Sequence, residues 1–158
     1  MESSLFLEPW ARALLVIHAL GAMALLGAVT HQGILAVGYL SGYTARHRLE
    51  ATYVRIVAWL YPAVFALGAL AYPTYRVRIR AAVFDLSAPW ASNAFDIKEN
   101  LAALGLFTAL ALALSRPRLS ISGPRGPLLR HAALGLSLAI LTWAQVVLGL
   151  VVTAEEGL

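Results

Sequence analysis

The stretch from Trp10 to Leu40 constrains the fold more than any other part of this sequence, because it is almost wholly apolar. No charged residue occurs between Arg12 and Arg46. At about 1.5 Å per helical residue, this run is longer than the roughly 30 Å needed to cross the hydrocarbon core of a bilayer. The segment therefore predicts a membrane-spanning helix.

The composition supports this prediction for the whole chain. Of its 158 residues, 60% are hydrophobic and 13% are charged, whereas a soluble domain has about 25% charged residues. The absence of cysteine excludes disulfides, thiolate metal sites, iron–sulfur clusters and covalently attached c-type haem. The net charge of +4 does not predict nucleic-acid binding, because the arginines fall between the apolar runs and not on one soluble face.

Three further apolar runs follow the first, so we expect an all-α fold: one integral membrane bundle of four transmembrane helices in a single domain, 1–158. The first connection is short and basic, the second is long, and the third is polar with several prolines and glycines, as is typical of loops between spans. The expected helices cover about 9–43, 49–72, 96–114 and 127–153.

The connection between the second and third runs, 73–95, is predicted to be an interfacial turn or short helix. Pro73 is expected to end the second helix, and Ser87 to cap a short helix within the connection. Asp96 and Glu99 have the three-residue spacing of a capping box, which predicts the start of the third helix.

The charges predict an orientation for this bundle. The two connections between helices one and two and between helices three and four share seven arginines against one glutamate, whereas the opposite side has five basic and seven acidic residues. Cytoplasmic loops carry the excess of Lys and Arg. We therefore expect a protein of the bacterial cytoplasmic membrane with both termini outside, in the periplasm.

Histidines within the spans are the strongest candidates for a functional site, because ionisable residues are rare in membrane helices. His18 and His31 lie in the first run, and His131 lies near the start of the fourth. In the expected orientation, His31 and His131 share the inner leaflet on two different helices, an arrangement that predicts two axial ligands to one haem iron. Haem propionates would then pair with interfacial arginines, for which the candidates are Arg46, Arg48, Arg55 and Arg130.

With these residues the chain resembles the small four-helix b-type membrane cytochromes in architecture. In the large dihaem cytochromes b, two histidines roughly 13 residues apart on one helix bind different haems, and the spacing of His18 and His31 is similar. Two departures limit the resemblance. Thirteen residues turn an ideal helix by about 220°, so the two side chains do not share a face, and no second-helix histidine is placed to partner His18. The resemblance thus implies one haem b, held by His31 and His131.

A second group of polar residues is expected on the outer side, where the second helix ends and the third begins. Its chemistry is suited to binding a quinone head group, passing protons or contacting a loop of another subunit. Helix capping and interfacial anchoring of long side chains are the alternative explanation. The group comprises Tyr72, Tyr75, Arg76, Asp96, Lys98 and Glu99.

These observations lead to three functional hypotheses. The first is a membrane anchor or electron-transfer subunit of a bacterial respiratory-type complex, which passes electrons between a redox partner protein and quinone. The second is a cofactor-free structural or accessory subunit, in which the histidines serve polar packing or partner contacts. The third is a small transport or sensing component, which requires a polar stripe through the bundle. A free-standing enzyme is not expected, because no nucleophile–base pair or phosphate-binding loop is evident in the sequence.

Overall fold

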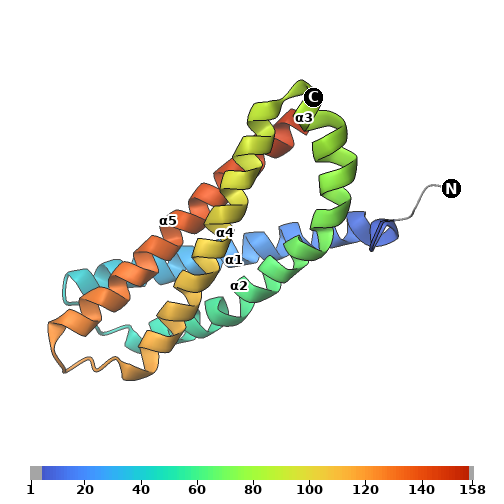
Figure 1. The fold of residues 1–158 in the computed structure, drawn as a ribbon. Helices are drawn as coiled ribbons and strands as arrows, with labels where there is room; N and C mark the ends of the chain where they lie inside the picture. The colour runs from blue at the N-terminus through green and yellow to red at the C-terminus, as the bar shows by residue number, and fades with distance from the viewer. Residues whose placement is uncertain (1–4, 157–158) are drawn as a thin grey trace.

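The computed structural model of the chain describes residues 5–156, and the only regular elements in that range are helices (Figure 1). Four of them are long and apolar enough to cross a membrane. The predicted all-α class with four candidate spans is therefore confirmed. The long helices are α1 (Ala11–Leu40), α2 (His47–Tyr75), α4 (Pro89–Ser115) and α5 (Arg125–Glu156).

Short helical segments extend or connect these spans. A 3-10 turn precedes α1, and another follows α4. Between α2 and α4 the chain continues as a π-helix and one further turn of α-helix. These segments are η1 (Glu8–Trp10), η2 (Arg76–Phe84), α3 (Asp85–Ser87) and η3 (Arg116–Arg118).

The connection 73–95, which was expected to be an interfacial turn or a short helix, is almost entirely helical. Pro73 does not end α2 but lies inside it. A proline removes its own N–H bond and crowds the preceding turn, yet the residues after it are free to remain helical. Helix is also the conformation that pairs backbone groups where water is scarce. The continuous helix extends the reach of α2 well beyond the predicted span.

The expected start of the third span also differs. α4 begins at Pro89, seven residues before Asp96, so Asp96 and Glu99 lie within the helix and do not form a capping box. Ser87 does not cap a helix either, because its hydroxyl donates to the Val83 carbonyl oxygen at 2.8 Å. The capping-box spacing is a local signal, and in the structure the Asp96 side chain pairs with Arg80 instead.

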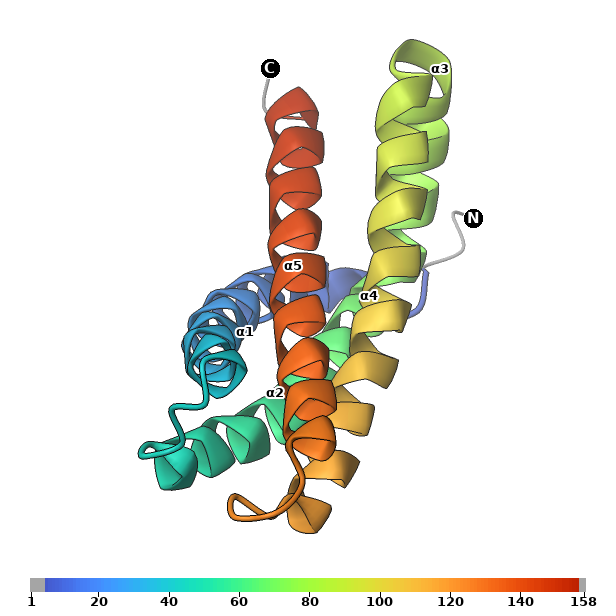
Figure 2. The same ribbon diagram turned by 90° about the vertical axis from the view of Figure 1, so that its left-hand side faces the viewer.

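The four long helices form one bundle, with α1 packed against α2 and α5, and α4 packed against α5 and α2 (Figures 1 and 2). We call the end that holds residues 41–46 and 116–124 the loop end. The opposite end holds η2, α3 and the C-terminal part of α5, and we call it the far end (Figure 1). The predicted sets of arginines in the two short connections therefore meet at one end of the bundle.

All four spans contribute to the central core. Val29, Val57, Leu112 and Leu138 are fully buried there, one from each helix. Small residues allow close approach: a Cβ atom on Gly33 would lie 3.1 Å from the Ala139 Cβ. The exterior is apolar as well, with many large hydrophobic side chains exposed on every span. Such a surface is suited to a lipid bilayer.

Candidate functional site

A buried carboxylate organises the loop end of the bundle. Glu50 lies in the first turn of α2 and is 0% exposed. Its Oε1 lies 2.7 Å from Nε2 of His131 on α5. Its Oε2 accepts hydrogen bonds from Nε of Arg116 at 2.7 Å and from the hydroxyl of Tyr39 at 3.2 Å. One carboxylate thus joins α1, α2, α5 and the residue that follows α4.

The partners of Glu50 are themselves held on their other sides. His131 is 1% exposed, and its Nδ1 lies 2.6 Å from Oγ of Ser115, the last residue of α4. Arg116 also donates from Nη2 to the His47 carbonyl oxygen at 2.9 Å. Buried charges are tolerated when they are paired and hydrogen-bonded in this way. We call Tyr39, Glu50, Ser115, Arg116 and His131 the Glu50 cluster.

Local helix electrostatics favour the positions of the two charged partners. A carboxylate is favoured in the first turn of a helix, where unpaired N–H groups carry partial positive charge, and Glu50 occupies such a place on α2. A cation is favoured at the opposite end of a helix, and Arg116 directly follows the last residue of α4. A negative charge therefore lies at the start of α2 and a positive charge at the end of α4, and the two side chains form an ion pair.

The chain of contacts from Ser115 through His131 to Glu50 has the connectivity of a hydrolytic triad. The surroundings do not suit that chemistry. Ser115 ends α4, where the backbone offers carbonyl oxygens instead of the N–H groups that stabilise an oxyanion. Its hydroxyl already lies 2.8 Å from the Leu112 carbonyl oxygen, to which it donates. The arrangement is a polar junction between helices.

The structure does not bring His31 and His131 together. His31 is exposed, its Nδ1 lies 2.8 Å from the Gly27 carbonyl oxygen, and its ring stacks on Tyr53 with centroids 5.2 Å apart. His131 has both ring nitrogens engaged in the Glu50 cluster. One residue turns a helix by about 100°, and it is Gln32 that faces α5. These side chains do not fit a haem clamped between His31 and His131.

His18 also has a partner in the structure. Its Nδ1 lies 3.0 Å from the Val64 carbonyl oxygen on α2. Gly68 leaves the space for the imidazole, since a Cβ atom there would lie 3.1 Å from Cε1 of His18. This contact joins α1 to α2, as the polar-packing alternative for the histidines requires.

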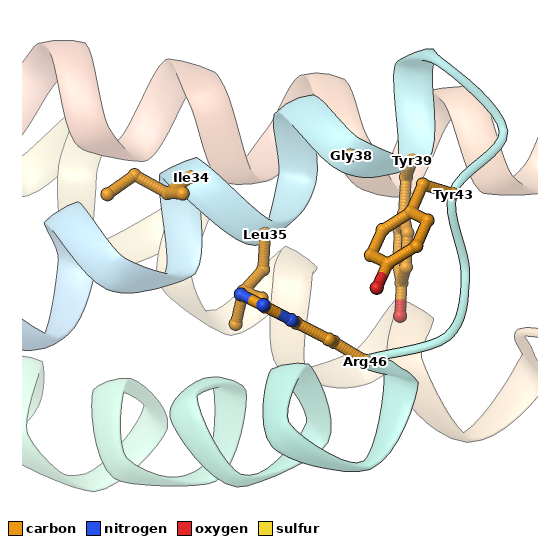
Figure 3. Close-up of a pocket in the computed structure, with 6 residues that line it drawn as sticks. All are labelled: Ile34, Leu35, Gly38, Tyr39, Tyr43 and Arg46. Atoms are coloured by element: carbon orange, nitrogen blue, oxygen red, sulfur yellow. The ribbon is translucent and has the colours of Figure 1, made fainter.

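The four arginines proposed for haem propionates do lie at the loop end, but they do not converge on one pocket. Arg48 and Arg130 are exposed. Arg55 bends back along its helix, where Nε donates to the Ala51 carbonyl oxygen at 3.4 Å. Arg46 lines a small pocket of about 70 Å³ between α1 and the following loop, and its side chain extends along α1 toward Leu35 (Figure 3).

Three of the six residues of the predicted outer group, Tyr72, Tyr75 and Lys98, lie around Phe95, which was not among the residues selected from the sequence. Tyr75 stacks on Phe95 with centroids 4.3 Å apart, and Tyr72 stacks on it at 6.2 Å. The ammonium of Lys98 lies 5.2 Å from the Phe95 ring centroid, at a distance typical of a cation–π contact.

An ion pair completes this part of the molecule. Arg80 of η2 donates from Nη1 and Nη2 to the two carboxylate oxygens of Asp96 at 2.6 and 2.9 Å. Asp96 was predicted to cap a helix, and its partner Arg80 was not among the residues predicted for this group. Arg76, which was, is exposed. This group, which we call the far-end cluster, therefore joins α2 and η2 to α4. It consists of Tyr72, Tyr75, Arg80, Phe95, Asp96 and Lys98.

Inside the bundle, a further polar contact joins Tyr61 to Gln145, whose Nε2 lies 3.0 Å from the Tyr61 hydroxyl oxygen. This layer is separated from the Glu50 cluster by the apolar core around Leu112 and Leu138. The part of the interior that the structure describes therefore holds separate polar layers and not the continuous stripe expected of a solute path.

Glu50, Ser115 and Arg116 were not among the residues selected from the sequence. One signal was available: Glu50 is the single acidic residue among the arginines of its connection, and it directly precedes an apolar run. A lone carboxylate at the start of a span needs a partner. The identity of that partner depends on which helices meet.

Comparisons of the chain with protein-family models, with curated proteins and with solved structures find no match. Within residues 5–156, no group of three or more His, Asp or Glu side chains is placed to hold a metal ion.

Proposed function

We propose that this protein is a cofactor-free accessory subunit of a larger membrane complex, and that the outward face of α1 packs against a partner's helix. One observation carries the proposal: His31 is exposed within a membrane span. It lies nine residues before Leu40, the end of α1, or about 14 Å along the helix axis. Ionisable residues at such depth almost always face protein or water instead of lipid.

The surroundings of His31 suit a closely packed helix. Ala24, Gly27 and His31 follow one another along one exposed face of α1. A Cβ atom on Gly27 would meet nothing within 4 Å, so the notch beside the imidazole is open. Small residues allow helix backbones to approach closely in lipid. The Nδ1 atom already contacts Gly27, which leaves Nε2 of His31 for a partner.

The other intramembrane histidines support the same proposal. His18 contacts α2, and His131 belongs to the Glu50 cluster. Each therefore serves packing within the chain, and His31 is the imidazole that faces outward. In the alternative hypothesis of electron transfer through haem and quinone, a His31 ligand would have to act from this outer face.

The test is the mass of the complex after extraction of native membranes with a lipid-preserving polymer. Wild-type protein should occur in a species heavier than its own 16.9 kDa. His31→Phe keeps a ring on Tyr53 but removes Nε2, and Gly27→Leu fills the notch, so both should release the monomer. Ala133→Leu on the exposed face of α5 is the matched control. A monomeric wild-type protein would overturn the proposal.

A reduced-minus-oxidised visible spectrum of the same preparation separates this proposal from the cytochrome hypothesis. We expect no b-type band from the subunit itself. A band that is present in the wild type and lost in both His31→Ala and His131→Ala would instead establish the bis-histidine haem.

A further inference from the structure

A groove of about 250 Å³ lies between α2 and α4 at the loop end. Most of its lining side chains are small or apolar, and two arginines also line it. The lining residues are Ala51, Val54, Arg55, Ala58, Ala113, Arg116 and Pro117.

The groove follows from the residue pattern of α2. Ala51 and Ala58 are seven residues apart, so they repeat on one face after about two turns. Ala113 faces them from α4. Because these three alanines are small, they leave a furrow between α2 and α4 that larger side chains would fill. The furrow runs along the membrane span and is suited to an acyl chain.

Arg55 brings a positive charge to the groove, whereas the charge of Arg116 is paired with Glu50. Arg55 is exposed and uses Nε to contact the Ala51 carbonyl oxygen, which lies one turn nearer the loop end. This contact holds its guanidinium toward the interface, as long basic side chains of membrane helices commonly are. Arg116 lies across from it, with Nε on Glu50 and Nη2 on the His47 carbonyl oxygen.

We propose that this groove binds one anionic phospholipid from the leaflet at the loop end. Its phosphate contacts Arg55 and Arg116, and one acyl chain occupies the alanine furrow. Basic pockets between spans on the cytoplasmic side bind anionic head groups, and the seven arginines of this end match that chemistry. Because Arg116 also holds Glu50, bound lipid stabilises the Glu50 cluster.

The test uses the full-length protein in nanodiscs of phosphatidylcholine with increasing phosphatidylglycerol. The melting temperature should rise saturably with phosphatidylglycerol, and native mass spectrometry should show one retained lipid. Arg55→Gln should weaken the apparent affinity about tenfold, as expected for the loss of one charged contact. Ala58→Leu should abolish retention because it fills the furrow.

Two controls match these variants. Arg12→Gln removes an exposed cation near the start of α1, and Ala63→Leu enlarges an exposed alanine of α2 outside the groove. Both should behave as wild type. Equal stabilisation by inorganic phosphate in neutral nanodiscs, or an Arg55→Gln variant indistinguishable from Arg12→Gln, would overturn the proposal. If Ala58→Leu fails to fold, the comparison between the two arginine variants decides.

Discussion

The two ends of this bundle use an arginine–carboxylate pair in different surroundings. At the loop end, the Glu50 side chain is 0% exposed and Arg116 18%. At the far end, Arg80 and Asp96 are 22% and 44% exposed, although their contact is bidentate. A buried pair is costly to break because it leaves an uncompensated charge, whereas an exposed pair is screened by solvent. Similar hydrogen-bond lengths therefore correspond to different contributions to stability.

The largest effect is expected from Glu50→Ala. This change leaves Arg116 and His131 without their shared partner, and breaking such a buried pair costs about 3–5 kcal/mol. The free energy of unfolding in detergent, followed by circular dichroism, measures the loss. Arg130→Gln, an exposed cation of the same end, should change little.

A second variant tests why Glu50→Ala is costly. Replacing Glu50, Arg116 and His131 together with leucine should destabilise the protein less than Glu50→Ala alone, because no buried charge then remains. A cost below about 1 kcal/mol for Glu50→Ala would show that the buried pair contributes no more than an exposed pair. The contrast between the two ends would then be wrong.

Phe95→Ala should have the next largest effect, at the far end. Two tyrosine rings stack on Phe95, and aromatic pairs contribute about 0.5–1.5 kcal/mol each beyond area burial. The expected loss of unfolding free energy is therefore about 1–3 kcal/mol, measured as above. Phe107→Ala, an exposed ring on the same helix, controls for lost apolar surface. Equal losses in the two variants would contradict a specific role for the stack.

Asp96→Asn should have a smaller effect, about 0.5–1 kcal/mol, because the pair with Arg80 is partly exposed. Raising the salt concentration to about 1 M shortens the screening length to about 3 Å. The difference between wild type and Asp96→Asn should then shrink, whereas the effect of Glu50→Ala should persist. If the effect of Asp96→Asn did not depend on salt, the Arg80–Asp96 pair would be as poorly screened as the buried Glu50–Arg116 pair, and the contrast would be wrong.

The smallest effect is expected from Glu8→Gln. Glu8 lies 2.7 Å from Nε of Arg78, but both side chains are solvent-accessible. Exposed ion pairs are often undetectable in stability measurements. We expect no measurable change in melting temperature, which a thermal scan at low and high salt checks. A clear loss at low salt would show that this contact anchors η1.

Sequence patterns were informative where the physical requirement is local. Each apolar run predicted one span, because the hydrophobicity of a segment is a property of its own residues. The helix boundaries near 73–95 were predicted less well. Pro73 is a local signal for the end of a helix and the Asp96–Glu99 spacing is one for a start, but α2 continues past Pro73 and α4 begins before Asp96. The bidentate contact with Arg80 shows what Asp96 does instead.

The candidate sites also differ in whether they depend on neighbours in the sequence or on how the helices pack. The outer group was predicted as a set of neighbours, since its residues flank one connection in the chain. The structure places Tyr72, Tyr75 and Lys98 around Phe95 and pairs Asp96 with Arg80. The haem pair was predicted from the shared membrane depth of His31 and His131 on two different helices. The membrane depth of a residue follows from its position along the helix. The direction of its side chain depends instead on how the helix is rotated about the helix axis, and in the structure His31 faces outward.

By itself, the sequence determined that this chain forms four apolar helices, because backbone groups in lipid must pair within their own segment. It also determined that arginines concentrate in the two short connections. Only the tertiary structure decided that Glu50 meets Arg116 and His131, which lie 66 and 81 residues away in the chain. Such contacts depend on the rotation and relative height of whole helices, which arise from packing of all four together.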